Sequence, residues 1–359
     1  MPGRYVGLYR LGDFERGLRS RQQLRRYRGK SRRDPLVIFL AILTGLVFVT
    51  ILLGADDFSS RPWSNRVASR GSDRTEGRLA MPDSDPTIHT LDVPGARLYY
   101  ERRGSGPLLL MLGSPMDSTG FAPLANALAD DYTVVTYDPR GIGNSSREDT
   151  TQDVTPEQQA EDVHRLLSAL GGEPADVFGS SGGAVVGLAL VTAHPDQVRT
   201  LVAHEPPVVE LLPDSAQVRA QIEDIYDTYR ADGAEKAMQK FMAHAGLGDA
   251  PGQEADAPRW EPSAEELARM RATTEQFLAH LLRPTTRYRP GIEALRAAST
   301  RIVVAGGTTS KGQLANRTAV ALAERLGTTV VDFPGDHGGF VALPEQCGRV
   351  LDQVLTETT

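Results

Sequence analysis

Residues 177–183 read VFGSSGG, and they place two serines between glycines directly after a short apolar run. The last five residues fit the pattern G-x-S-x-G, with Ser181 at the centre. Such a pattern either presents a nucleophilic serine on a strained turn or forms a flexible glycine-rich loop. The first interpretation requires a strand before the pattern and a helix after it.

The surrounding residues favour the nucleophile. The apolar run 175–178 is typical of a short buried strand, and AVVGLALVTAH, which follows the glycines, is typical of a helix. At so sharp a turn, Gly179 and Gly183 relieve the crowding around a serine in an unfavourable backbone conformation. The amides at the helix N-terminus favour negative charge near the serine hydroxyl. We therefore predict that Ser181 is a nucleophile and that Ser180 is only its neighbour.

From residue 91 onward, short apolar runs alternate with helical patterns, which is typical of crossover units around a mostly parallel sheet. The expected strands cover residues 97–102, 107–112, 133–137, 175–178, 200–204, 301–305 and 329–333, and the expected helices cover residues 121–129, 156–170, 182–194, 313–326 and 344–355. The sequence thus predicts an α/β fold with helices on both faces of the sheet.

Residues 206–298 interrupt this alternation, because they contain helical patterns such as 215–230 but no convincing strand. Ser263 and Glu266 form a capping-box pattern at the start of a further helix. We predict an inserted helical lid over a pocket, and the alternative is a set of helices that merely covers one face of the sheet. The core is then expected to comprise residues 87–205 and 299–359.

A nucleophilic serine needs a base and donors for the developing oxyanion. His337 lies in the sequence FPGDHGGF, after the last expected strand and before the last expected helix, so it can reach Ser181 across the carboxyl edge of the sheet. The loop after the strand PLLLML brings Ser114 and Pro115 to the same edge. Because proline has no N–H, we expect the amides of Ser114 and Gly182 to bind the oxyanion.

Three motifs in this order resemble those of the α/β-hydrolase superfamily: GSSGG at the elbow, DPRGIGNS at residues 138–145, and the late GDHGGF. The resemblance covers nearly all of residues 90–357. It implies that Asp138 organises a loop and takes no part in the reaction. The motif at 138–145 lacks the third glycine of a dinucleotide fingerprint. In place of the family's usual His-Gly before the oxyanion loop, this chain has Leu112 and Gly113.

The chain departs from the family at the catalytic acid. The acid usually follows the strand before the histidine strand, but no Asp or Glu occurs in residues 301–323, and Thr309 and Ser310 cannot carry the charge. Some members supply the acid from the end of the strand before the lid, where this chain has Glu205. The alternatives are Asp336, whose side chain is expected to diverge from its neighbour His337, and no acid at all.

These observations predict a serine hydrolase that cleaves an ester-like bond of a small or acyl substrate, with Ser181, His337 and Glu205 as the catalytic set. Cleavage of an amide, thioester or carbon–carbon bond stays an open alternative. The resemblance disfavours epoxide hydrolysis and dehalogenation, which commonly use Asp at the elbow. No metal or organic cofactor is implied. Because an acid is missing from its usual place, a ligand-binding or scaffolding protein without turnover is the main alternative, and an acyltransferase is another.

Charge is unevenly distributed along the chain. Residues 1–55 contain eleven Lys or Arg and three acidic residues, whereas the whole chain has a net charge of −7. The remainder is therefore strongly acidic, which makes nucleic acid an improbable partner. The single cysteine, Cys347, excludes an internal disulfide.

An uncharged run of twenty residues begins at Leu36 and ends at Ala55. As a helix it would span roughly 30 Å, the thickness of a bilayer core. We expect a transmembrane anchor preceded by the basic cytoplasmic arm 1–35 and followed by the polar linker 56–86, with the catalytic domain outside the cytoplasm. A cleaved signal peptide or a buried helix is the alternative, and translation from Met81 would give a cytoplasmic protein.

Overall fold

The computed structural model describes residues 85–247 and 263–357. The predicted basic arm 1–35, the predicted transmembrane run 36–55 and nearly all of the predicted linker 56–86 lie outside these residues. Among the described residues, no helix combines the length and the apolar character needed to cross a bilayer.

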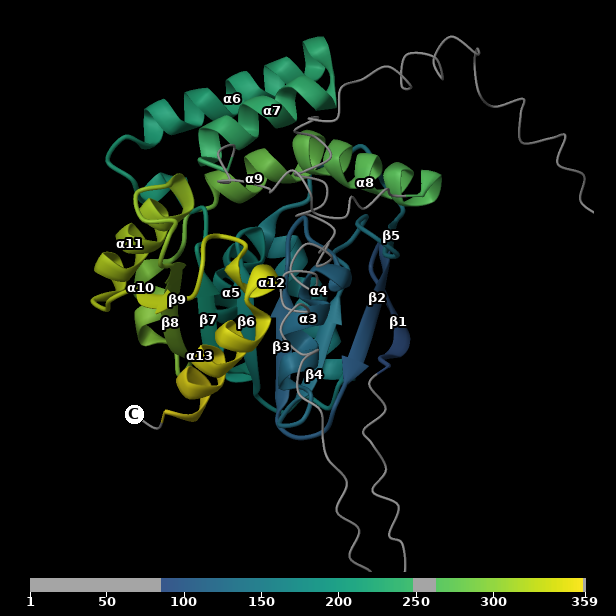
Figure 1. Cartoon of the computed structure of the whole chain (residues 1–359), viewed down its shortest axis with the longest axis vertical. Helices are drawn as coiled ribbons and strands as arrows, with labels where there is room; N and C mark the ends of the chain where they lie inside the picture. Colours follow the sequence, from purple (N-terminus) through teal and green to yellow (C-terminus); the bar gives the residue numbers. More distant parts are fainter. Residues whose placement is uncertain (1–84, 248–262, 358–359) are drawn as a thin grey trace, which may run out of the picture.

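A single mixed sheet organises the described part of the chain (Figure 1). Its strands have the order β1-β2-β4-β3-β6-β7-β8-β9, and β5 pairs with β2. Pairing is parallel from β4 through β9 and antiparallel among β1, β2, β4 and β5. The strands are β1 (Thr87–Val93), β2 (Ala96–Arg103), β3 (Leu108–Leu112), β4 (Thr133–Tyr137), β5 (Ser146–Arg147), β6 (Ala175–Ser180), β7 (Val198–His204), β8 (Arg301–Gly307) and β9 (Val331–Phe333). The predicted mostly parallel α/β fold is confirmed.

Helices cover both faces of this sheet. They are α3 (Ser118–Leu128), α4 (Pro156–Ala169), α5 (Gly182–Ala193), α11 (Leu314–Leu326), α12 (Gly339–Ala342) and α13 (Pro344–Thr356). Side chains alternate along β3, so that Leu110 packs into the apolar core with α4, α5 and α11, whereas Leu109 and Met111 pack with α3 and α13. Both faces of the central strands are thereby buried, which explains their continuous apolar runs.

The sequence did not predict the strands β1 and β5. Most residues of β1 are exposed, and its sequence TIHTLDV lacks the apolar run that marked the central strands. As an edge strand it is fixed by pairing with β2 through the turn at Pro94 and Gly95, where Gly95 has a φ of 71°. The strand β5 is only two residues long. Edge strands of this kind are set by pairing rather than by burial, so they carry a weak sequence signal.

The segment between β7 and β8 is helical wherever it is described, apart from short connections. It contains α6 (Ser215–Asp232), α7 (Ala234–Ala245), α8 (Ala264–Gln276), a π-helical turn (Phe277–Leu281), α9 (Leu282–Arg287) and α10 (Ile292–Ala297). The predicted capping box at α8 is present, with reciprocal bonds of 2.7 and 3.2 Å between Ser263 and Glu266.

The helices α6, α7, α8 and α9 lie over one end of the sheet (Figure 1), and we call these helices, together with the π-helical turn between α8 and α9, the helical insertion. Side chains of α6, α7, the π-helical turn and α9 share an apolar core that includes Ile222, Met238 and Leu278, and Ile142 and Val154 from the sheet-bearing part join it. The helix α10 instead packs against α5 and α11. The insertion therefore has its own core and is also anchored on the sheet below it.

Candidate active site

Ser181 lies at the junction of β6 and α5 in a backbone conformation that non-glycine residues rarely adopt. Its φ is 55° and its ψ is −125°. The amide of Ser181 donates to the carbonyl of His204 at 2.9 Å, which continues the pairing of β6 with β7 beyond the end of the strand. Left-handed conformations of this kind are strained and persist only where the surroundings enforce them.

Close packing around Ser181 explains the neighbouring glycines. A Cβ on Gly183 would lie 2.0 Å from the carbonyl oxygen of Leu112, and one on Gly179 would lie 2.7 Å from the carbonyl oxygen of Gly183. A Cβ on Gly182 would lie 2.4 Å from the carbonyl oxygen of Ser114. Because these neighbours are backbone atoms, they cannot move aside cheaply. Only glycine fits at these positions, as expected for Gly179 and Gly183.

Ser180 faces the protein core. Its hydroxyl lies 3.1 Å from Nδ1 of His204, and both side chains are buried. Burial lowers the pKa of His204 to about 4, with His337 adding to the effect and Glu205 opposing it, so the ring is neutral at pH 7. Ser180 is therefore held by a core contact, while Ser181 lines the cavity described below.

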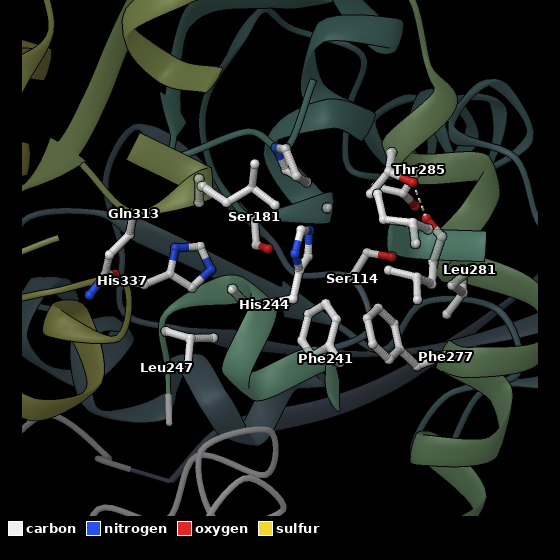
Figure 2. A pocket seen from close by; sticks show the side chains of 18 residues that line it. Ser114, Ser181, Phe241, His244, Leu247, Phe277, Leu281, Thr285, Gln313 and His337 are labelled. Carbon is white, nitrogen blue, oxygen red and sulfur yellow. Dashed lines mark hydrogen bonds between the residues drawn. The ribbon is translucent and has the colours of Figure 1, made fainter. Parts of the chain in front are cut away.

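His337 follows β9 on a loop that brings its ring to the cavity lined by Ser181 (Figure 2). Nδ1 of His337 lies 2.6 Å from Oε2 of Glu205, at the end of β7. This contact leaves Nε2 as the ring nitrogen that can serve Ser181. No hydrogen bond joins Ser181 to His337 in the described part of the chain, and such contacts commonly shorten only when substrate closes the site.

Glu205 is fully buried and has the left-handed φ of 48°. Its Oε1 accepts hydrogen bonds from the amide of Gly307, at 3.0 Å, and from the hydroxyl of Ser310. Burial alone would raise the pKa of this carboxyl, but the hydrogen bond and charge of His337, with help from His204 and Ser310, bring it to about 2. Glu205 is therefore ionised at neutral pH.

Ser310 occupies a position where the family resemblance placed the acid. Its hydroxyl donates a hydrogen bond to the carboxylate of Glu205. Ser310 follows β8 and is fully buried, and its hydroxyl donates both to Glu205 and, at 3.0 Å, to the carbonyl of Gly307. Asp336, the alternative acid, is exposed and accepts from the amide of Gly338 at 2.9 Å. The only carboxylate that contacts the His337 ring among the described residues is therefore that of Glu205.

Ser114 and Gly182, the predicted oxyanion residues, both line the cavity. The Cα of Gly182 lies against the carbonyl of Ser114. Within residues 85–247 and 263–357, neither amide donates to a protein acceptor. Buried N–H groups are nearly always paired, so two unpaired amides on a cavity wall are well suited to an anionic oxygen of a ligand.

The cavity lies between the sheet and the helical insertion, with about 700 Å³ of empty space, counting the part that is open to solvent. The insertion contributes mainly apolar side chains, among them Ile222, Phe241, Phe277, Leu281 and Leu282 (Figure 2). Phe241 and Phe277 pack edge to face with their ring centroids 5.0 Å apart. A hydrophobic chamber thus surrounds the polar groups at its base, as is usual for small-molecule sites.

Residues 106–340 match the model of a family described as the alpha/beta hydrolase fold, which is more than half of the chain. The chain belongs to the α/β-hydrolase family. It is 35% identical over 273 residues to the uncharacterized hydrolase YraK of Bacillus subtilis, covering 74% of this chain and 95% of that protein. It is 26% identical over 281 residues to the zearalenone hydrolase of Bionectria ochroleuca, covering 76% of this chain and 98% of that protein.

Solved structures share the fold. A thermophilic esterase from Thermogutta terrifontis is similar with a TM-score of 0.55 and 22% identity, covering 76% of this chain and 98% of that chain. A hydrolase from Pseudomonas aeruginosa is similar with a TM-score of 0.58 and 22% identity, covering 75% and 98% of the two chains. The architecture around Ser181 is thus that of known α/β hydrolases.

In this α/β hydrolase, Asp138 ties together the loops beside the site. It is fully buried and accepts from the amides of Ser118, at 2.8 Å, and Asn144, at 2.7 Å. Burial, reinforced by the charge of Asp117, raises its pKa to about 6. A Cβ on Gly143 would lie 2.4 Å from the Asp138 carboxylate, which explains that glycine. These contacts fit the loop-organising role that the family resemblance implied.

Sequence reasoning missed several residues of this hydrolase's site. Ser310 was noticed only as a residue that cannot serve as the acid, and no sequence pattern singled out His244, yet His244 lines the cavity. Gln313, Thr285 and Thr286 line it as well. No motif marks such positions, because they depend on how the insertion packs over the sheet. In the described residues, no group of three or more His, Cys, Asp or Glu could hold a metal ion.

Proposed function

We propose that this α/β hydrolase is a serine hydrolase that cleaves an ester-like bond through an acyl-enzyme, with Ser181 as nucleophile, His337 as general base and acid, and Glu205 as the group that orients His337. One observation carries the proposal. The strained Ser181 shares a cavity with a histidine whose far nitrogen is bound, at 2.6 Å, to a buried carboxylate.

In the proposed reaction, His337 accepts one proton and releases it again in each of the two half-reactions. Nε2 of His337 takes the proton of the Ser181 hydroxyl as its oxygen attacks the carbonyl carbon, and it passes that proton to the leaving alcohol as the ester bond breaks. Water then gives a proton to Nε2 as its oxygen attacks the acyl carbon, and the imidazolium passes that proton to Oγ of Ser181 as the acyl–Oγ bond breaks, which releases the acid and restores Ser181. Glu205 stays ionised throughout, since its folded pKa is about 2, and it stabilises the imidazolium that forms in each step.

The amides of Ser114 and Gly182 are the proposed donors to the oxyanion of each tetrahedral intermediate. Their lack of protein acceptors and their place in the cavity wall support this role. Donors fixed in a poorly hydrated site stabilise developing charge without having to reorganise, and one such donor is typically worth about 10²–10³ in rate.

The apolar walls favour substrates with an apolar acyl or alcohol part. The names of the relatives support hydrolysis, and one structural neighbour is called an esterase. Ligand binding without turnover is the rival function, and it was motivated by the acid missing from residues 301–323. Because Glu205 contacts His337, the absence of an acid from residues 301–323 no longer argues for this rival function.

The decisive experiment is labelling by a fluorophosphonate probe, together with turnover of short- and long-chain acyl esters. We expect labelling of the wild type and loss of both signals in Ser181→Ala. Ser180→Ala is the matched control, because it removes the adjacent hydroxyl, which contacts His204 and not the cavity. A folded wild-type protein that neither reacts with the probe nor hydrolyses any ester would refute the proposal. Adding alcohol acceptors during turnover distinguishes an acyltransferase.

We also propose that residues 36–55 anchor the protein in a membrane with the hydrolase domain outside the cytoplasm. The support is the uncharged apolar run and the basic residues before it. Cell fractionation and N-terminal mapping of the mature protein test this proposal. Membrane association that requires residues 36–55 supports it, whereas a soluble product that begins at Met81 refutes it.

A further inference from the structure

Among the side chains that line the cavity, two have a polar atom that is fully buried and has no protein partner within the described residues. Nε2 of His244 and Oγ of Ser114 are both buried, and neither makes a hydrogen bond within the described residues. Both residues line the same cavity as Ser181 and His337 (Figure 2). A buried donor or acceptor without a partner typically costs about 1–3 kcal/mol. Such atoms are retained where a ligand can satisfy them.

His244 reaches the cavity from the helical insertion. It lies in the last turn of α7, and Phe241 and Ala245 from the same helix also line the cavity. Elsewhere on this helix, Met238 and Met242 are buried in the core of the insertion. The imidazole is therefore a polar group presented by an otherwise apolar wall.

The polar groups of the proposed reaction do not account for His244. Nδ1 of His337 is bound to Glu205, and the proposed oxyanion donors are backbone amides on other elements. In the view of Figure 2, the rings of His337 and His244 enter the cavity on different sides of the Ser181 hydroxyl. In this view His244 and His337 thus flank the Ser181 hydroxyl from opposite sides.

We infer that Nε2 of His244 binds a second polar group on the substrate, a hydroxyl or a carbonyl carried on an apolar body away from the bond that is cleaved. This inference rests on the proposed function for the identity of that bond. It names the substrate class more closely: an ester or related compound that is largely apolar but carries one further uncharged hydrogen-bonding group. His244 would then select among substrates without taking part in the proton transfers.

The charge state of His244 agrees with an uncharged group. Burial lowers the pKa of its ring, so at pH 7 the imidazole is neutral and offers one donor and one acceptor. A neutral ring can bind a hydroxyl or a carbonyl, but it provides no positive charge that would offset the desolvation of a carboxylate. The hydroxyl of Ser114, which can both donate and accept, is another buried and unpaired group in the cavity.

The test measures binding separately from turnover. The ligands are methyl octanoate and a series of methyl octanoates with a keto or hydroxyl group at successive carbons from the third outward. Their dissociation constants are measured by calorimetry on Ser181→Ala, and their kcat/KM values on the wild type. We expect at least one position to bind about 10-fold more tightly than methyl octanoate, which corresponds to one net hydrogen bond.

Adding His244→Leu should abolish this advantage and leave the affinity for methyl octanoate itself nearly unchanged, whereas His244→Gln should retain part of it. His280→Leu is the matched control, because His280 lies on the insertion but contacts Asp153 and does not line the cavity. An advantage that survives His244→Leu, or no advantage at any position, overturns the inference. Failure of the proposed function would appear differently, as absent turnover and probe labelling in the wild type.

Discussion

The carboxylate of Glu205, at the end of β7, lies 2.6 Å from Nδ1 of His337, on the loop after β9. The strand β8 lies between these two strands in the sheet, and its last residue and the loop after it contact Glu205. Gly307 donates its amide, and Ser310 donates its hydroxyl, to the other oxygen of Glu205. The carboxylate that contacts His337 thus lies one strand away from the position where the family resemblance placed an acid, and Ser310 at that position donates a hydrogen bond to it.

Glu205→Gln is the first prediction. A neutral amide can hold the wrong tautomer of His337 and cannot stabilise the imidazolium, so we expect kcat to fall about 10³–10⁴-fold while KM changes little. Steady-state kinetics on an activated ester measure the loss. Asp336→Asn is the matched control and should keep nearly full activity, since Asp336 is exposed and bonds to the amide of Gly338. If the two variants behave in the opposite way, the acid is Asp336.

Ser310→Ala tests whether the hydrogen bond from the Ser310 hydroxyl holds the Glu205 carboxylate in place. It removes a hydrogen bond to a buried charged oxygen, an interaction typically worth about 1.5–3 kcal/mol. We expect lower stability and a decrease of about tenfold in kcat, because Glu205 becomes less well fixed and its pKa rises. Ser310→Thr, which retains a hydroxyl, is the conservative comparison. Unchanged stability and activity in Ser310→Ala would mean that Gly307 and His337 suffice to hold the carboxylate.

Much of the fold could be predicted because its central strands are buried on both faces. The run TVVTY at 133–137 became β4 with the predicted boundaries, and VFGSSGG lies at the β6–α5 junction, as predicted. The edge strand β1 could not be predicted in the same way, since its residues are mostly exposed and its pairing with β2 fixes it. Local patterns report burial, whereas edge pairing is a property of the assembled sheet.

The site was only partly predictable, because several of its contacts exist only in the assembled fold. The glycines around Ser181 reflect local crowding and are visible in a short motif, but the contact of Glu205 with His337 joins residues 132 positions apart. The sequence favoured Glu205 as the acid over Asp336 and over no acid at all, but no local pattern shows its contact with His337. His244 gave no signal, because its significance depends on how α7 packs over the cavity.

Ser114→Ala distinguishes the backbone of the predicted oxyanion loop from its side chain. If the amide of Ser114 is the donor, removing the hydroxyl should change kcat for a simple aliphatic ester less than tenfold, because the amide remains. Loss of a true oxyanion donor would instead cost about 10²–10³. Because the buried hydroxyl has no protein partner, Ser114→Ala should be at least as stable as the wild type. A loss of 10² or more in kcat with a normal melting temperature would assign the donor to the side chain.

Lowering the pH should decrease the free energy of unfolding in two pH ranges, one set by His204 and the other by Glu205. Because the folded pKa of His204 is about 4, below the ordinary 6.5, the unfolded chain binds an extra proton between these values, and stability falls as pH decreases through this range. By pH 5 the loss is about 2 kcal/mol. Glu205, with a folded pKa of about 2 against the ordinary 4.5, contributes stability that is present above pH 4.5 and is lost toward pH 2.

Urea unfolding at pH 7, 5 and 4 measures these contributions. The decrease in unfolding free energy from pH 7 to 5 should be smaller in His204→Gln than in the wild type. Glu205→Gln should keep this decrease, but it should lack the contribution of Glu205 at pH 7 and 5 and approach the wild type as the pH falls below 4.5. Asp138 acts in the opposite sense, since its raised pKa of about 6 makes its contribution decline as pH rises from 3.8 to 6. It is present in all three proteins, so it cancels in the comparison. An equal decrease in His204→Gln and the wild type would show that the ring can be protonated without loss of stability in the folded protein.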